Sequence, residues 1–241
     1  MPITERQTGL LKAIIHEYIA STEPVGSQKL VEKYNLKISP ATVRNEMVDL
    51  ITEGYLEMRH TSSGRVPTTM GFRFFVDRVL EEGEMSILQE VAMKQRLWPT
   101  RFEFEKMLRQ AALALSEITK NLAITTTYDG HMFHAGSVNV LSAPEFWEID
   151  VAKAALNLLD SHEVMHSIFE KAHTDRDVRV IIGDEIGLSN LKSCCLIFAP
   201  YTSGRRSGVV AVLGPSRIEY ENVIPAVRYT KNLLEELGAS W

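Results

Sequence analysis

Residues 39–50 have the sequence SPATVRNEMVDL, and this stretch decides how the N-terminal part of the chain folds. Ser39 before Pro40 is the favoured order of an N-cap residue and a proline at the first helical position. The apolar residues that follow recur on one face of a helix: Val43, Met47, Leu50 and Ile51. The pattern therefore predicts a helix over residues 41–53, ended by Gly54.

Two shorter helices are predicted before this stretch. Thr4 is suited to cap the first, whose apolar side chains recur at helical spacing over residues 10–19. The breaker Pro24-Val25-Gly26 ends it, and Ser27 is suited to cap the second. Three short helices, the last two joined by a short turn, are typical of a helix-turn-helix.

The segment after Gly54 predicts a two-stranded wing. Residues 55–59 alternate between apolar and polar side chains, as a strand does, and residues 60–67 form a polar loop with a return. Thr68 or Thr69 then begins another helix. We therefore interpret residues 1–80 as a winged helix-turn-helix domain that binds DNA.

The outward face of the helix at residues 41–53 carries side chains that suit DNA. The guanidinium of Arg44 matches O6 and N7 of guanine, and Asn45 can pair with adenine. Thr42 and Ser39 suit phosphate oxygens or a thymine methyl group. The predicted wing adds further DNA-binding candidates: Arg59, His60, Ser63, Gly64 and Arg65. The alternatives are an ordinary solvated helix face and an ordinary hairpin.

Charge is unevenly distributed along the chain. The 241 residues carry a formal net charge of −5, yet residues 1–80 hold 10 Lys and Arg against 9 Asp and Glu. Residues 81–241 hold 16 against 22. Basic residues in an otherwise acidic chain indicate a surface for anions. Because the sequence shows neither a signal-peptide pattern nor an apolar run long enough for a membrane span, we expect a soluble, cytoplasmic protein.

The rest of the chain predicts an α+β fold. Residues 81–101 are interpreted as a linker with a helix, and residues 102–241 as the second domain. That domain is expected to begin with an amphipathic helix over residues 102–122 and a strand to Tyr128, and Asp129-Gly130 is a strong hairpin-turn signal. Further helices are expected at residues 143–159, 163–171 and 221–237, and strands at residues 178–183, 193–200 and 207–214.

The sequence gives no support for an enzyme, a cofactor or a metal site. It contains no GxSxG, GxGxxG or P-loop pattern, and its histidines and two cysteines lack the spacing of metal ligands. Cys194 and Cys195 lie in an apolar run and are expected to be buried, unreactive thiols. A small-molecule site in the second domain is an alternative, with these candidate residues: Asp184, Glu185, Arg205, Arg206 and Arg217.

Nine segments carry a resemblance to a known family. Those in the first domain are ITERQ (3–7), EPVGSQKL (23–30), SPATVRNEMVDL (39–50), EGYL (53–56), HTSSGRVPT (60–68) and GFRFFVDRVL (71–80). Those in the second are NVLSAPEF (139–146), VIIGDE (180–185) and GPSRIEY (214–220). In this order they resemble the HrcA heat-inducible transcription repressors.

This resemblance implies a repressor of chaperone operons that binds an inverted-repeat operator, called CIRCE, as a homodimer. It also implies a winged helix, a GAF-like domain with an inserted dimerising domain, and promotion of the active form by a GroE-type chaperonin. On that basis Thr42, Arg44 and Asn45 fall on the family's recognition helix. The residues that fall on its wing are His60, Ser63, Gly64 and Arg65.

The chain departs from the family after Tyr128. The family has a long stretch there, including the inserted domain, whereas this chain has the short Asp129-Gly130 turn. The insert is therefore expected to be absent or vestigial near residues 129–135. An alternative function is a winged-helix regulator with a different operator, controlled by a small ligand in the GAF-like domain. A protein–protein adaptor that never contacts DNA is a third.

Overall fold

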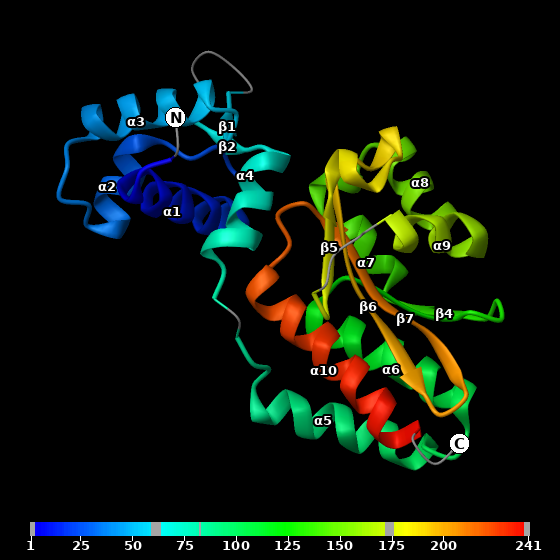
Figure 1. The fold of residues 1–241 in the computed structure, drawn as a ribbon. Coiled ribbons are helices and arrows are strands. Elements are labelled where there is room, and N and C mark those ends of the chain that lie inside the picture. Colours follow the sequence, from blue (N-terminus) through cyan, green and yellow to red (C-terminus); the bar gives the residue numbers. More distant parts are fainter. Residues whose placement is uncertain (1–2, 59–63, 82, 172–175, 239–241) are drawn as a thin grey trace. The chain divides into compact units, whose positions relative to one another are not determined.

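The computed structural model describes residues 3–58, 64–81, 83–171 and 176–238. The chain divides into two compact units, residues 1–81 and residues 82–241. Figure 1 labels most of the helices and strands of each. The protein is α+β, as the sequence predicts, because the first unit is mostly helical and the second is built on a five-stranded sheet.

In the first unit, helices precede a small antiparallel sheet. Its described elements are α1 (Glu5–Ser21), α2 (Ser27–Tyr34), α3 (Pro40–Thr52), β1 (Leu56–Glu57), β2 (Val66–Pro67) and α4 (Thr69–Phe74), which continues as a π-helix (Phe75–Val79). Apolar side chains from these helices are almost fully buried and form the core: Leu11, Ile14, Leu30, Val43, Leu50 and Phe75.

Side-chain caps fix where the helices of this unit begin. Thr4 accepts a hydrogen bond from the backbone N–H of Gln7 at the start of α1, and Thr68 caps α4. Ser39 caps α3 as predicted. The predicted cap of α2 is wrong: Gly26 is the N-cap residue, and Ser27 is already helical and buried.

The second unit contains the larger sheet and the remaining helices. Its described elements are α5 (Ile87–Leu97), α6 (Phe104–Thr119), β3 (Leu122–Thr127), β4 (Met132–Ala135), α7 (Ser137–Ser142), α8 (Ile149–Asp160), α9 (His162–Lys171), β5 (Arg179–Ile182), β6 (Cys194–Ser203), β7 (Arg206–Pro215) and α10 (Tyr220–Gly238), with 3₁₀ turns at Trp98–Thr100, Pro144–Phe146, Gly183–Ile186 and Ser189–Leu191.

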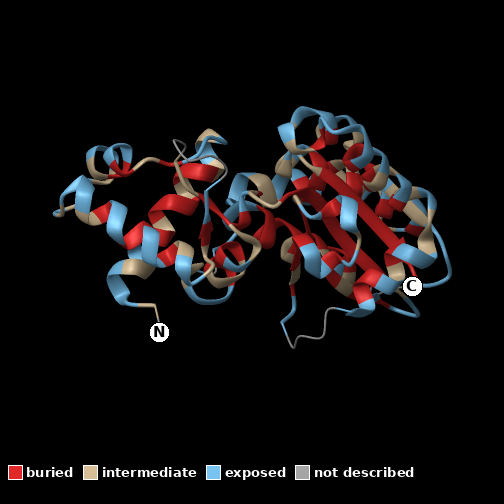
Figure 2. Cartoon of the chain, turned by 90° about the horizontal axis from the view of Figure 1, so that it is seen from above, coloured by how far each residue is buried: buried red, intermediate tan, exposed pale blue. Residues whose placement is uncertain are grey.

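The sheet has the strand order β4-β3-β7-β6-β5, and every neighbouring pair is antiparallel. Helices cover both of its faces. On one face the Thr125 hydroxyl donates to the Leu108 carbonyl of α6, and the Ser203 hydroxyl donates to the Leu234 carbonyl of α10. On the other face Phe198 packs against Phe169 of α9. In Figure 2 the strands accordingly appear as a buried layer.

Several predicted boundaries in this unit are wrong. The helix expected from residue 102 begins at Phe104 and ends at Thr119, because Lys120 takes the left-handed conformation and stops it. The helix expected over residues 143–159 is split into a 3₁₀ turn and α8. The loop expected at residues 201–206 is only the Gly204-Arg205 turn, because β6 and β7 pair as far as Ser203 and Arg206.

Most of the predicted linker lies within the second unit. Helix α5 turns Met93 and Leu97 inward, and both are buried. The hydroxyl of Thr230 on α10 donates to the Met93 sulfur, and Arg96 forms an ion pair with Glu117 of α6. Residues 87–97 are thus a helix packed against the second unit. Their many charged and polar side chains had suggested a linker instead.

The predicted turn and thiols are found where the sequence placed them. Asp129 and Gly130 lie in the turn between β3 and β4, and Gly130 has a φ of +102°. Cys194 and Cys195 are both fully buried. Burial raises the pKa of the Cys194 thiol to about 12, so this side chain stays protonated and unreactive near neutral pH.

Candidate nucleic-acid interface

The start of α3 is held by its own cap. The Ser39 hydroxyl accepts a hydrogen bond from the backbone N–H of Thr42 at 3.1 Å and lies 2.9 Å from the Thr42 hydroxyl. Pro40 occupies the first helical position, where a missing N–H costs little. Both hydroxyls that the sequence suggested as DNA contacts therefore fix the geometry of the helix start.

The inward face of α3 anchors it on the rest of the unit. Val43, Met47 and Leu50 are buried. Glu46 is also buried and forms an ion pair with Arg6 of α1. Because a buried carboxylate is stable only with a charged or hydrogen-bonding partner, this pair helps to decide which face of α3 turns outward.

The outward face of α3 exposes Arg44 and Asn45. Within the described part of the chain, neither side chain has a hydrogen bond or an ion pair. Val48, one turn further along, is 48% exposed. A guanidinium, a carboxamide and an exposed apolar group are the side-chain types that recognise guanine, adenine and the thymine methyl group.

Val48 is a candidate that the sequence prediction missed. It lies four residues after Arg44 and three after Asn45, so helical spacing alone puts it on the same face. Because Val48 is apolar, it resembles a core residue, and its helical spacing from Arg44 and Asn45 was therefore overlooked.

The hairpin after α3 is tied to the segment before α2. In β1 and β2, Leu56 pairs with Pro67 and Glu57 with Val66. The pairing extends to Val25, whose N–H donates to the Arg65 carbonyl and whose carbonyl accepts from the Arg65 N–H, both at 2.9 Å. The sequence prediction missed this bridge, since it treated residues 24–26 only as a helix breaker.

Gly64 is required by packing within the chain. A Cβ at this position would lie 2.6 Å from backbone atoms of Pro24 and Val25. Such a contact is far shorter than van der Waals separation, so the Val25–Arg65 bridge tolerates no side chain here. The sequence suggested Gly64 as a DNA-binding candidate, whereas in the structure its missing side chain makes room for residues 24–25.

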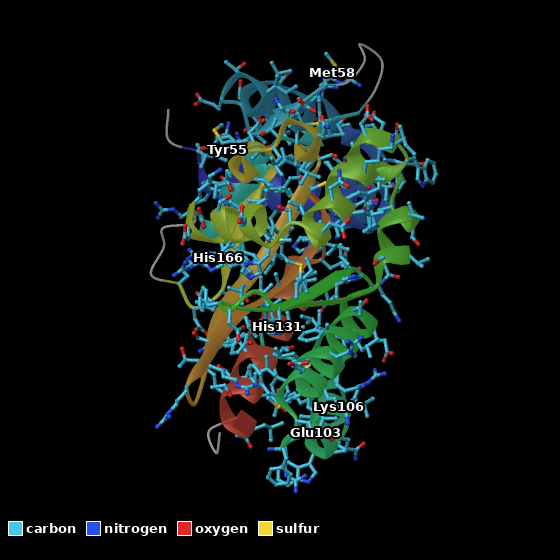
Figure 3. All side chains as sticks on the ribbon, turned by 90° about the vertical axis from the view of Figure 1, so that its right-hand side faces the viewer. Tyr55, Met58, Glu103, Lys106, His131 and His166 are labelled. Atoms are coloured by element: carbon cyan, nitrogen blue, oxygen red, sulfur yellow. The ribbon has the colours of Figure 1, made fainter. Side chains whose placement is uncertain are left out.

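The described part of the hairpin includes only some of the predicted DNA contacts. Three of the predicted contacts, Arg59, His60 and Ser63, lie outside the described residues. At the base of the hairpin, the Tyr55 ring packs edge-on against Phe74 at 5.2 Å between centroids. Figure 3 labels Tyr55 and also Met58, which is 41% exposed. The structure thus fixes the base of the hairpin and the returning residue Arg65, which is half-buried.

The lysines near α3 differ in whether they form ion pairs within the chain. Lys29 and Lys33 of α2 both bind the buried Glu17 carboxylate of α1, at 2.8 and 2.5 Å. Lys37, in the turn between α2 and α3, is exposed and forms no ion pair with a described residue. It is a second candidate that the sequence prediction missed, and a flexible cation beside the start of α3 suits a phosphate.

Three of the five residues considered for a small-molecule site have other partners in the second unit. Arg217 forms a bidentate pair with Glu145, and Asp184 pairs with Lys192. Arg206 lies over the Phe104 ring. A groove of about 260 Å³ lies between α10 and the residues around the start of α5, and none of the five suggested residues lines it. Among the described residues, these contacts hold Arg217, Asp184 and Arg206 in three separate places.

Two negative findings apply to the described residues. They contain no cluster of three or more His, Cys, Asp or Glu side chains that could hold a metal ion. None of their helices is both long enough and apolar enough to cross a bilayer.

Comparison with known proteins agrees with this arrangement. A crystal structure described as that of a hypothetical protein superposes on the whole chain with a TM-score of 0.78 at 18% identity, covering 99% of both chains. The two-unit α+β fold is therefore one that an experimental structure shares. The model of the HrcA protein C-terminal domain matches residues 74–224.

The chain belongs to the HrcA family, since that match covers more than half of its length. Curated relatives named "Heat-inducible transcription repressor HrcA" include those of Acetivibrio thermocellus and Clostridium perfringens. The first is 25% identical, covering 98% of this chain and 96% of the relative. The second is 28% identical, covering 97% and 98%. These relatives are transcription repressors and not enzymes.

Proposed function

We propose that this chain is a sequence-specific repressor of heat-shock chaperone operons, and that it binds a CIRCE-type inverted repeat of DNA as a homodimer. The outward face of α3 carries the proposal. There Arg44 and Asn45 stand exposed and adjacent, on a helix whose opposite face is anchored by apolar burial and the Arg6–Glu46 pair. The names of the relatives support the same function.

In this proposal the first unit is a winged helix-turn-helix. Helices α2 and α3, with the turn between them, form the helix-turn-helix, and α3 enters the major groove. The β1–β2 hairpin is the wing. Its bridge to Val25 supports this layout, because it ties the wing to the segment that precedes α2. Arg59, His60, Ser63 and Arg65 are proposed to contact phosphates or the minor groove.

The second unit is proposed to be a GAF-like domain that lacks the family's inserted dimerising domain. Two observations support this. The β3 and β4 strands are joined by a short turn at Asp129-Gly130. The alignment with the Acetivibrio thermocellus relative extends over 338 positions, whereas this chain has 241 residues, so the relative has segments without a counterpart here.

The proposed mechanism is occlusion of a promoter. Two copies place their α3 helices in the two halves of the inverted repeat, so the two-fold symmetry of the dimer matches that of the operator. Such a repressor acts where the chromosome lies, which makes the cytoplasm its proposed location. Control by a GroE-type chaperonin, which would favour the binding-competent state, is part of the proposal on the family resemblance alone.

A titration of fluorescent duplexes tests the function. The wild-type chain should bind a CIRCE duplex far more tightly than a scrambled duplex of equal composition, at each of several salt concentrations. The logarithm of its affinity should fall linearly with the logarithm of the salt concentration for both duplexes, because phosphate contacts release counterions. Equal affinity for the two duplexes would exclude sequence-specific repression. Absence of binding to both would favour the adaptor.

A further inference from the structure

The groove between α10 and the start of α5 has a volume of about 260 Å³. Figure 1 shows these two helices side by side. Two contacts join them: Lys94 pairs with Glu236, and the Tyr229 hydroxyl donates to the Glu90 carbonyl at 3.3 Å. The volume is just below the range of about 300–1,000 Å³ that is usual for pockets of drug-sized ligands, so the groove suits a smaller molecule.

Two carboxylates line this groove without a cationic partner. Glu90, in the first turn of α5, is half-buried, and Glu84 is exposed. Within the described part of the chain, neither carboxylate accepts a hydrogen bond or forms an ion pair. By contrast, the nearby Glu236 carboxylate is paired with Lys94. Because partial burial removes some of the water around a carboxylate, Glu90 in particular would gain from a cation in the groove.

The other lining groups suit the rest of an organic cation. Met85 and Pro225 are buried and supply apolar surface. Tyr229 supplies an aromatic ring, a group that attracts cations, and burial raises the pKa of its phenol, so the hydroxyl stays neutral. Asn232 is exposed, and its side chain forms no hydrogen bond with a described residue, so its carbonyl oxygen can accept one.

The charges that line the groove favour an organic cation over an anion or a metal ion. Arg228 is the only cationic side chain among the described lining residues, and no ion pair joins it to Glu84 or Glu90. Two carboxylates against one guanidinium leave the groove negative. The described residues contain no group of three or more His, Cys, Asp or Glu side chains that could hold a metal ion. An ammonium group needs fewer acceptors than the six to eight oxygen ligands of Ca²⁺.

We propose that this groove binds a small aliphatic diamine, whose ammonium groups donate hydrogen bonds to the carboxylates of Glu90 and Glu84. The hydrocarbon chain of the diamine lies against Met85 and Pro225. The groove belongs wholly to the second unit and uses none of the residues proposed to contact DNA, so this inference does not depend on the proposed function.

Calorimetric titration of the full-length chain tests the site. The probe is 1,4-diaminobutane, and 1,4-butanediol is its uncharged control of the same length. The wild type should bind the diamine saturably, at one site per chain, and should not bind the diol. Magnesium chloride should give no saturable heat, because Mg²⁺ holds its water tightly and has no hydrocarbon chain to place in the groove.

A pair of matched variants tests the assigned carboxylate. Glu90→Gln should weaken diamine binding at least about tenfold, because a charge-assisted hydrogen bond is replaced by a neutral one. Glu163→Gln is the control: Glu163 is also an acidic residue in the first turn of a helix of this unit, α9, and it does not line the groove. Both variants lose the same interaction with a helix dipole, so only Glu90→Gln should change the affinity.

Four outcomes would overturn the proposal. They are a wild type that does not bind the diamine, equal binding of the diol, a Glu90→Gln variant that binds like the wild type, and an equal loss in Glu163→Gln. The methylamide of acetyl-lysine presents the same ammonium group on a peptide. If it binds more tightly than the diamine, the groove recognises a lysine of a protein partner, and the assignment to a small molecule fails. Because no titration contains DNA, failure here leaves the proposed function standing.

Discussion

Arg44 is the residue on which the proposed recognition depends most. It is exposed and lies one turn after the capped start of α3. Its planar guanidinium offers several hydrogen-bond donors in a fixed arrangement to a partner on this face of the helix. Asn45 beside it is the second side chain proposed to contact a base. Neither side chain has a hydrogen bond or an ion pair with the described part of the chain, so replacing them should remove the proposed DNA contacts without disturbing packing.

We therefore expect Arg44→Ala to lower the affinity for the inverted repeat by about 1–3 kcal/mol, and to lower the affinity for scrambled DNA much less. Its thermal unfolding should match that of the wild type. Arg205→Ala is the control, since Arg205 is an exposed arginine in the β6–β7 turn of the second unit. Fluorescence anisotropy measures the affinities of the wild type and both variants for the two duplexes, and equal losses on the two duplexes would remove Arg44 from base recognition.

Glu17 is the residue that links α1 to α2. Its carboxylate is buried, and hydrogen bonds from Lys29 and Lys33 hold its pKa below the ordinary value of 4.5. A carboxyl group with a lowered folded-state pKa stabilises the fold above its unfolded-state pKa. This contribution is lost as the pH falls through the folded-state pKa.

Glu17→Gln should consequently lower the unfolding midpoint of the first unit near neutral pH. The difference from the wild type should be constant down to about pH 4.5 and should shrink below it. Glu32→Gln, at an exposed position of α2, should leave the midpoint almost unchanged at every pH. Thermal melts across a pH series measure this, and a difference that grows in acid would contradict the assigned role.

At the scale of elements, the caps and the apolar periodicity of α1 and α3 were predictable from the sequence, because they depend on neighbouring residues alone. The Val25–Arg65 bridge was not, since forty residues separate its partners. The same reason hid the packing of α5, whose buried residues meet α10 from the far end of the chain. Lys37 was missed because its exposure depends on tertiary packing, whereas Val48 was missed because an apolar side chain suggests a core position.

The bridge between the wing and the segment before α2 gives a test at this scale. Gly64→Ala should destabilise the first unit by about 1–3 kcal/mol, because the added methyl group overlaps the backbone of residues 24–25. Gly9→Ala should instead stabilise it by about 0.5–1 kcal/mol. Gly9 lies within α1, and nothing lies within 4 Å of a Cβ built there. Urea unfolding measures both, and a Gly64→Ala variant as stable as the wild type would contradict the packing assigned to this glycine.

At the scale of the whole molecule, the net charge of −5 is unevenly shared between the two units. The first unit is nearly neutral and the second is acidic, so bulk attraction for DNA is weak and affinity must come from positioned contacts. That is the behaviour expected of a repressor selective for one operator.

Protection of guanine N7 from methylation on a CIRCE duplex tests the central claim most directly, because N7 lies in the major groove where α3 is proposed to bind. The wild-type chain should protect guanines in both halves of the repeat, at positions related by its two-fold axis. Arg44→Ala should lose this protection at concentrations where it still binds the duplex. Protection that is absent in the wild type, or unchanged by Arg44→Ala, would contradict recognition through α3.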